Sequence, residues 1–269
     1  MSSGHLLAIT GGHRYDVDAF AAMLDDVCAR LGWRWTHAEH PAAQQWLAPE
    51  HAGRFDAIVL HDLPGLQLAR GAEPRVEPID PAVEAALIGL LEAGQGIVAT
   101  HHALAGWPTC DAWATALGGR FLYAPGTLRG EAWPPSGYRF DRYRVLPATT
   151  EHPVCTGVTP FDLTDELYLC PVFEDEVEAL LTTDADLSPT SMIDTYDEVV
   201  GAVRRPAEPG AGGSNLLGWA KSAGRSPLVY LLPGHSASTM EHPQYRRLLT
   251  NAVEWVASAD AHAWARVRR

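Results

Sequence analysis

The chain has 269 residues, of which 46% are hydrophobic, and its formal net charge is −13. This length and composition suit one large globular domain and exclude a disordered or fibrous protein. The acidic charge disfavours nucleic acids and anionic membrane surfaces as partners, because both would repel the protein.

The first hundred residues alternate between strand and helix patterns. Apolar runs bounded by turn residues predict strands over residues 5–10, 33–39, 55–62 and 95–100. Apolar residues at helical spacing predict helices over 16–32 and 80–94. The residues expected to cap these helices are Asp16, Gly32, Asp80 and Gly94. Alternating strands and helices imply crossover connections, and therefore a parallel sheet in an α/β fold.

The remainder of the chain is less regular. Residues 119–150 are rich in glycine, proline and aromatic residues, and we expect an insertion here, as a lid or hairpin over a site. Further elements are expected as short strands over 165–169 and 177–183, an antiparallel pair over 216–221 and 227–233, and a last helix over 243–259. Because no internal repeat or linker is found, we expect a single domain over residues 1–269.

Cysteine usage and hydropathy predict a cytoplasmic protein. The four cysteines show no C-x-x-C spacing, and a chain of this length does not need disulfides. No segment reaches the roughly 18 apolar residues of a membrane helix, and the first residues lack the features of a signal peptide. The abundance of tryptophan is a weak indication of a homo-oligomer.

Histidines follow four of the predicted strands. Ligands of open parallel sheets bind beyond the carboxyl ends of the strands, so these side chains are expected near one crevice. They are His13, His61, His101, His102 and His235. The pair of His61 and Asp62 is a weaker candidate, because an aspartate after a strand is often a cap, and that structural role is favoured over function. Gly12 and His13 lead into a helix N-terminus, where an anion or a sugar hydroxyl could bind.

His101 and His102 are adjacent, so we ask which of the two side chains faces the crevice. Neighbouring residues of a strand point to opposite faces, so only one of the pair is expected to reach the crevice. We favour His102, because it begins the turn. The alternative is that one imidazole satisfies a backbone carbonyl in the core and the other faces solvent.

Carboxylates and aromatic residues complete the set of candidates. Asp165 and Glu166 precede a short predicted strand, and could serve as acid, base or metal ligand, or equally as a capping turn. Trp107 and Tyr123 flank the expected insertion. Their rings could pack on a sugar, although ordinary core packing is slightly favoured for such residues.

Several motifs of the chain occur in the order found in the ThuA-like (trehalose utilisation) family. They are GIVATHHALAGWP, GGRFLYAP, HPVCTGV, TDELY and LVYLLPGHSASTMEHPQYRRLLTNAVEWVAS. The chain resembles that family from about Leu6 to Ser258. The resemblance implies the fold of class I glutamine amidotransferases, a flavodoxin-like three-layer α/β sandwich with a mostly parallel central sheet.

The comparison with glutamine amidotransferases argues against glutaminase activity. Those enzymes carry a nucleophilic cysteine in the turn where this chain has Thr100, His101 and His102. They also follow a late strand with His-x-Glu, whereas here Ala237 stands two residues after His235. Without the thiolate and the orienting carboxylate, hydrolysis of glutamine by the usual covalent route has no chemical basis.

The family resemblance implies carbohydrate catabolism, often of sugars oxidised at carbon 3. A ketone acidifies the adjacent C–H bond, so a histidine or glutamate could abstract that proton while a second group stabilises the enolate. The candidate catalytic residues are His101, His102, Glu166 and His235, and the candidate substrate-binding residues are Gly12, His13, Trp107, Tyr123 and Asp165. A divalent metal such as zinc could bind at His13, His102 and His235. The alternative hypothesis is a non-catalytic carbohydrate-binding or regulatory module on a degenerate amidotransferase scaffold.

Overall fold

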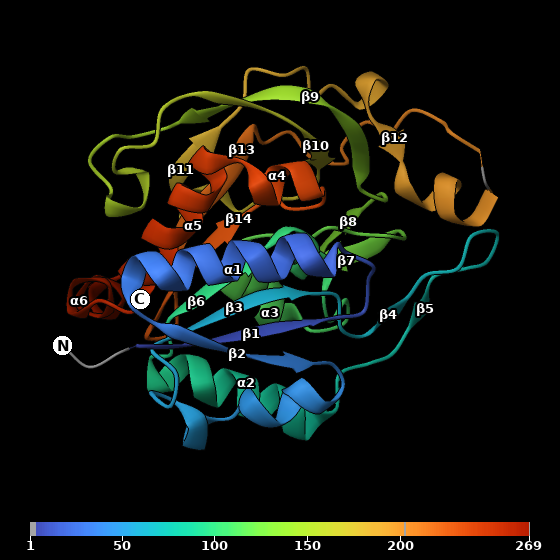
Figure 1. The fold of residues 1–269 in the computed structure, drawn as a ribbon. Coiled ribbons are helices and arrows are strands. Elements are labelled where there is room, and N and C mark those ends of the chain that lie inside the picture. The colour runs from blue at the N-terminus through green and yellow to red at the C-terminus, as the bar shows by residue number, and fades with distance from the viewer. Residues whose placement is uncertain (1–3, 202, 269) are drawn as a thin grey trace.

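The computed structural model describes residues 4–201 and 203–268, which form a mixed α/β structure around one large sheet (Figure 1). Five adjacent strands of this sheet run parallel, in the order β2-β1-β3-β6-β14. These strands are β1 (His5–Gly11), β2 (Arg34–Glu39), β3 (Ala57–Asp62), β6 (Ile97–Thr100) and β14 (Ser226–Leu231). The predicted α/β class with a mostly parallel central sheet is confirmed. The order of these five strands is that of flavodoxin-like sheets.

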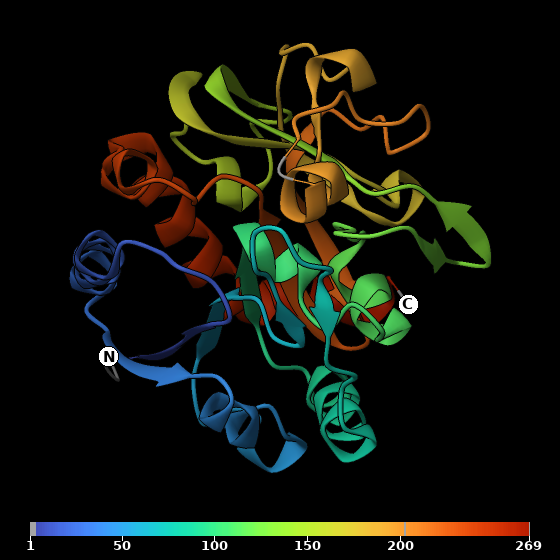
Figure 2. The same ribbon diagram turned by 90° about the vertical axis from the view of Figure 1, so that its right-hand side faces the viewer.

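The sheet continues beyond β14 with antiparallel strands, in the order β13, β11, β9 and β10. These are β13 (Leu216–Ala223), β11 (Glu178–Thr182), β9 (Gly137–Pro147) and β10 (Phe161–Leu169), and the short β12 (Ile193–Asp194) pairs with β9. In Figure 2, β9, β10 and β12 gather at one end of the molecule, above the parallel strands. The predicted antiparallel pair over 216–221 and 227–233 corresponds to β13 and β14.

Helices cover both faces of the parallel strands. Figure 1 shows α1 and α5 on one face and α2 on the other. The helices are α1 (Val17–Leu31), α2 (Pro81–Ala93), α3 (Asp111–Leu117), α4 (Ala237–Glu241), α5 (Pro243–Val256) and α6 (Ala259–Val267). Asp16 and Asp80 accept hydrogen bonds from backbone amides at the starts of α1 and α2, and Gly32 and Gly94 end these helices in the left-handed conformation, as predicted. No helix in the described part of the chain is long and apolar enough to cross a membrane.

The segment expected as an insertion, residues 119–150, contributes to two different structures. Its first half contains a small hairpin of β7 (Gly126–Leu128) and β8 (Glu131–Trp133). Its second half is β9, which pairs with β10 along nine residues and is therefore part of the main sheet. A second small ribbon, of β4 (Leu66–Gln67) and β5 (Arg75–Val76), lies apart from the sheet.

The direction of the strand connections reverses beside β1, and this places the site. The chain passes from β1 to β2 on one side, and from β2 to β3 on the other side of β1. Loops that follow β1 and β3 therefore diverge and leave a crevice at the carboxyl ends of the strands. All six residues of β3 are buried, as expected for a central strand covered on both faces.

Candidate functional site

Three imidazoles and one carboxylate converge beyond the carboxyl ends of the parallel strands. They belong to His101, His102, Glu166 and His235, and one ligand atom from each lies within 4.8 Å of all the others. The two adjacent histidines come from the 3-10 turn η3 (His101–Ala105) after β6, the glutamate from β10, and His235 from the loop after β14. The four candidate catalytic residues of the sequence are thus brought together.

His101 is the most constrained member of this four-residue cluster. Its φ of 50° is in the left-handed region that non-glycine residues rarely adopt, and its side chain is 0% exposed. The Tyr230 hydroxyl donates to the His101 carbonyl (2.9 Å), and His101 Nδ1 lies 3.0 Å from the Leu232 carbonyl. A carbonyl only accepts, so Nδ1 carries the proton and Nε2 is left as a lone pair.

The free Nε2 of His101 faces the rest of the cluster. It lies 3.1 Å from His235 Nδ1 and 3.5 Å from Glu166 Oε2, while His235 Nδ1 lies 3.6 Å from Glu166 Oε1. Burial and the neighbouring histidines lower the pKa of His101 well below its ordinary value. The nitrogen therefore remains unprotonated near neutral pH, as both a metal ligand and a base must be.

Both histidines of the pair belong to the cluster, but only His102, the one favoured from the sequence, lines the cavity. The strand ends at Thr100, and the left-handed turn at His101 replaces the alternation of an extended strand. The rings of His101 and His102 consequently lie 4.0 Å apart, centroid to centroid. They differ in access, because His102 lines a cavity and His101 lies beneath it.

Tyr168 is the functional candidate that the sequence reasoning missed. Its hydroxyl lies 3.1 Å from His101 Nε2, 3.1 Å from His102 Nδ1 and 3.2 Å from Glu166 Oε2. Alternation along a strand places residues i and i+2 on one face, so Glu166 and Tyr168 share a face of β10. This period of two in the TDELY motif was the signal that could have identified the tyrosine.

The same alternation turns Asp165 away from the cavity. Asp165 is 0% exposed, and its carboxylate accepts hydrogen bonds from the backbone amides of Gly234 (2.9 Å) and Ser236 (3.2 Å). These two residues flank His235. The structure therefore places Asp165 as a support of the loop that carries His235, rather than in the substrate-binding position that the sequence suggested.

His13 and Gly12 lie next to the cluster but outside the group of four ligand atoms. The His13 ring packs edge-on against His102, with 4.5 Å between centroids, and its nitrogens lie 2.9 and 3.3 Å from the carbonyls of Arg14 and His61. A neutral imidazole has one N–H and donates to only one of these carbonyls, and His13 is not among the residues whose ligand atoms lie within 4.8 Å of one another. Gly12 has a φ of 86°, and a Cβ there would overlap the Leu63 carbonyl, so the close approach of two loops requires glycine.

His61, for which a structural role was favoured over function, is buried beside this cluster. The Thr100 hydroxyl donates to the Leu60 carbonyl (3.0 Å) and so accepts from His61 Nδ1 (2.9 Å). His61 Nε2 is buried and has no hydrogen-bond partner among the described residues. Burial lowers the pKa of His61 well below its ordinary value, which keeps the ring neutral.

A cavity of about 160 Å³ opens over His102 and Glu166. Its wall is largely aromatic and consists of His102, Phe121, Tyr123, Tyr138, Glu166, Tyr168, Thr195, Glu198 and Val199. Tyr123 thus lines the cavity, whereas Trp107 is 1% exposed and packs in the core against Trp113, the role that the sequence slightly favoured for both residues. Burial raises the pKa of Glu166, although the His235 ring opposes this shift.

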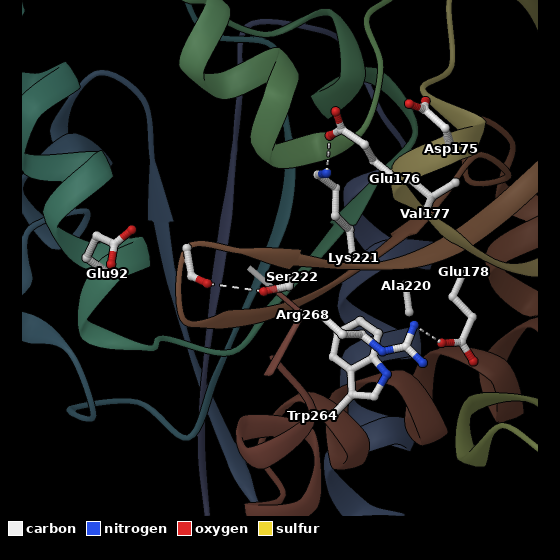
Figure 3. A pocket seen from close by; sticks show the side chains of 11 residues that line it. Glu92, Asp175, Glu176, Val177, Glu178, Ala220, Lys221, Ser222, Trp264 and Arg268 are labelled. Atoms are coloured by element: carbon white, nitrogen blue, oxygen red, sulfur yellow. Dashed lines mark hydrogen bonds and ion pairs between the residues drawn. The ribbon is translucent and has the colours of Figure 1, made fainter. Parts of the chain in front are cut away.

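A larger cavity lies elsewhere, beside β11, β13 and α6. It measures about 630 Å³, and Figure 3 shows the side chains that line it, among them Lys221, Trp264 and Arg268. Its charged groups pair with one another, as in the contact of Lys221 Nζ with Glu176 (2.6 Å). No histidine lines this cavity, so the chemistry described above does not extend to it.

The fold and the crevice define a flavodoxin-like α/β protein with a histidine-rich site. Two solved structures of ThuA-like proteins are similar to it over nearly their whole lengths. That from Parabacteroides merdae has a TM-score of 0.66 and 15% identity, covering 96% of this chain and 91% of the other. That from Bacteroides uniformis has a TM-score of 0.63 and 17% identity, covering 95% and 93%. At these identities the likeness shows the fold alone.

A family model settles the classification. The model described as ThuA, trehalose utilisation, matches residues 7–256, and the chain therefore belongs to the ThuA family. A cytoplasmic protein from Salmonella typhimurium LT2 also shares the fold, with a TM-score of 0.57, 11% identity and coverage of 93% and 99%. Among curated proteins, no sequence matches the chain at a significant level.

Proposed function

We propose that the protein is an enzyme of carbohydrate catabolism that acts on a sugar or 3-keto-sugar at the cluster of His101, His102, Glu166 and His235. The observation that carries this proposal is the convergence of three imidazoles and a carboxylate beside a small, mostly aromatic cavity, which His102 and Glu166 line. Membership of the trehalose utilisation family supports a carbohydrate as substrate. We further infer a cytoplasmic location, because the Salmonella protein of similar fold is named a cytoplasmic protein.

The cluster fits a divalent metal such as zinc. Tetrahedral zinc with bonds of about 2.0 Å holds its ligand atoms about 3.3 Å apart. His101 Nε2 and His235 Nδ1 lie 3.1 Å apart, close to that spacing, and each lies near a different oxygen of Glu166, Oε2 at 3.5 Å and Oε1 at 3.6 Å. We infer that these three residues hold the metal. When bound, it would supply a Lewis acid that polarises a carbonyl oxygen of the substrate.

His102 is the proposed proton acceptor. The Tyr168 hydroxyl has one proton, which the acceptor-only Glu166 carboxylate takes (3.2 Å), so the hydroxyl accepts from His102 Nδ1–H (3.1 Å). This arrangement leaves His102 Nε2 without a proton, in a residue that lines the cavity. Burial lowers the pKa of His102 and so keeps the ring neutral and able to accept a proton.

The reaction that this arrangement favours is removal of a proton next to a sugar ketone. His102 would accept the proton, and the aromatic wall, including Tyr123 and Tyr138, would pack on the ring faces and exclude water. Elimination, isomerisation and cleavage of a glycosidic bond can all follow from the enolate. Tyr168 would keep the His102 ring oriented through these steps.

A substrate screen tests the proposal. Purified protein is supplied with zinc and offered 3-keto-glucosides, 3-keto-trehalose and their unoxidised parents, and products are followed by mass spectrometry. We expect turnover of a keto-sugar only, and its loss in His102→Ala and His235→Ala variants whose circular dichroism matches that of the wild type. Binding of a sugar with no turnover would instead support a non-catalytic carbohydrate-binding module. Full activity of both variants would refute the site.

A further inference from the structure

The cavity wall contains a buried hydroxyl that the protein itself leaves unsatisfied. Thr195 lines the cavity, is 2% exposed, and its Oγ1 has no hydrogen-bond partner among the described residues. A buried hydroxyl without a partner costs stability, so its presence calls for an explanation. The two carboxylates of the wall differ, since Glu198 pairs with Arg204 (3.1 Å) and Glu166 accepts from the Tyr168 hydroxyl (3.2 Å).

The backbone around Thr195 is fixed, so the hydroxyl has a defined position. The Thr195 amide donates to the Ser136 carbonyl (3.1 Å), at the entry to β9. The buried Asp194 carboxylate accepts from the Asp197 amide (2.9 Å) and closes the following turn. A group held this firmly can recognise a ligand without an ordering cost at binding.

The segment after Thr195 also bridges the mouth of the site to the ribbon of β4 and β5. The Gly71 amide donates to the Val199 carbonyl (2.7 Å), and the Tyr196 hydroxyl donates to Glu73 (2.6 Å). Figure 1 shows these two distant parts of the chain side by side, at the tip of the ribbon. These two hydrogen bonds hold the outer side of the cavity wall that carries Thr195.

The volume of the cavity limits the size of the ligand that it can hold. Cavities of about 150 Å³ accommodate a six-membered ring such as benzene. The cavity over His102 measures about 160 Å³ and therefore suits the ring of one sugar, so that any second ring would lie outside it. Unlike benzene, a sugar ring carries hydroxyl groups that need partners when they are buried.

We propose that Thr195 is a specificity-determining residue that hydrogen-bonds one hydroxyl of a single sugar ring held in this cavity. This inference rests on the proposed function, because it assumes that a sugar is the ligand. The unsatisfied Oγ1 and the hydroxyl of the ligand would satisfy each other, whereas a ring that lacks that hydroxyl would leave Thr195 unpaired.

The Thr195→Val variant separates recognition from structure. Valine keeps the shape and removes only a hydroxyl that bonds to nothing in the protein, so the melting temperature without ligand should equal or exceed that of the wild type. Thr182→Val is the matched control, because Thr182 lies on β11, away from the cavity, with its hydroxyl near the Leu146 carbonyl. A lower melting temperature of the Thr195 variant would show a structural hydrogen bond and overturn the inference.

Calorimetry then measures ligand binding to both variants and to the wild type. The probes are methyl α-glucoside, which has no ketone to react, and its 2-, 3-, 4- and 6-deoxy analogues. We expect the Thr195→Val variant to bind the parent glucoside about tenfold more weakly. One deoxy analogue should bind equally to the variant and to the wild type, which identifies the hydroxyl concerned. The Thr182 variant should behave as the wild type.

The outcomes distinguish this inference from the proposed function. If the wild type binds the glucoside and the Thr195 variant binds it equally well, the inference is overturned and the proposed function stands. If the wild type binds neither the glucoside nor its 3-keto form, the ligand is not a sugar. The proposed function then fails, and the inference fails with it.

Discussion

Replacement of Asp165 by asparagine should lower both the stability of the protein and its affinity for zinc, although it replaces none of the proposed metal ligands. The two carboxylate oxygens accept three backbone amides: those of Gly234 (2.9 Å), Ser236 (3.2 Å) and Glu166 (2.9 Å). Asparagine keeps one acceptor oxygen and places an amino group where the other oxygen was. At least one N–H, on Glu166 or on a residue next to His235, then loses its acceptor.

The expected cost follows from these contacts. One buried donor left unsatisfied costs about 1–3 kcal/mol, and loss of the charge weakens the bonds that remain, so we expect a total of about 2–4 kcal/mol. For a domain of this size each kcal/mol lowers the melting temperature by about 2–4 °C. Because the loop carrying His235 loosens, affinity for zinc should fall about 10–100-fold, as is usual when support of a metal ligand is lost.

Thermal unfolding and competition with a zinc chelator measure the two effects. Asp162→Asn is the matched control, because Asp162 lies on the same strand with an exposed side chain that pairs with Arg142. A surface ion pair of this kind contributes little, so the control should stay within about 1 kcal/mol of the wild type. Unchanged stability and zinc affinity in Asp165→Asn would refute the assignment of Asp165 as the support of the His235 loop.

Three further predictions follow from the geometry. His102→Gln should bind zinc with nearly wild-type stoichiometry but lose at least about a hundredfold in turnover, because it removes the proton acceptor and spares the three proposed ligands; loss of zinc would contradict this division of roles. The metal-free protein should lose stability as the pH falls below about 6.5. The free energy of unfolding should fall by up to about 1.4 kcal/mol per pH unit for each of His61, His101 and His102. Urea titrations at pH 7 and 5.5 measure this difference. Their pKa values are lowered in the folded state, so the unfolded chain takes up protons first; equal stability at both pH values would count against buried neutral rings. Gly12→Ala should cost at least about 2 kcal/mol, because its Cβ would overlap the Leu63 carbonyl and its φ is 86°; a melting temperature equal to that of the wild type would refute the close approach.

The elements that local chemistry defines could be predicted from the sequence. Capping residues such as Asp16 and Gly94 contact only the nearest turn of their own helix, so the local sequence identifies them. A continuous apolar run such as that of β3 directly indicates a buried strand. The convergence of histidines followed from a general property of parallel sheets, that the loops after their strands meet at one edge. This property brought His101 and His235 together although they are 134 residues apart.

The orientations inside the site could not be predicted in the same way. His101 adopts a left-handed backbone that no local pattern requires, and tertiary contacts to Tyr230 and Leu232 hold it there. Strand alternation fails at that residue, which is why both histidines point to the cluster. On β10 the alternation does hold. Applied there, it would have placed Asp165 and Glu166 on opposite faces of the strand and added Tyr168 to the candidate site residues.

The sequence also could not show which aromatic residues line the cavity. Trp107 and Tyr123 are equivalent in the sequence pattern, but Trp107 fills the core and Tyr123 lines the cavity. The residues from 195 to 199 approach the cavity only because β12 pairs with β9. The role of β9 in the main sheet was hidden by its many polar residues, since several of its side chains face solvent.

The metal content of the protein tests the central claim most directly. Wild-type protein is loaded with zinc, dialysed against buffer without metal and analysed by mass spectrometry, beside His101→Ala, Glu166→Gln, His235→Ala and the control His262→Ala, which alters a histidine on α6. We predict one equivalent of zinc in the wild type and the control, and less than about a tenth of an equivalent in the other three. Absence of zinc from the wild type, or its full retention in all three variants, would contradict the account.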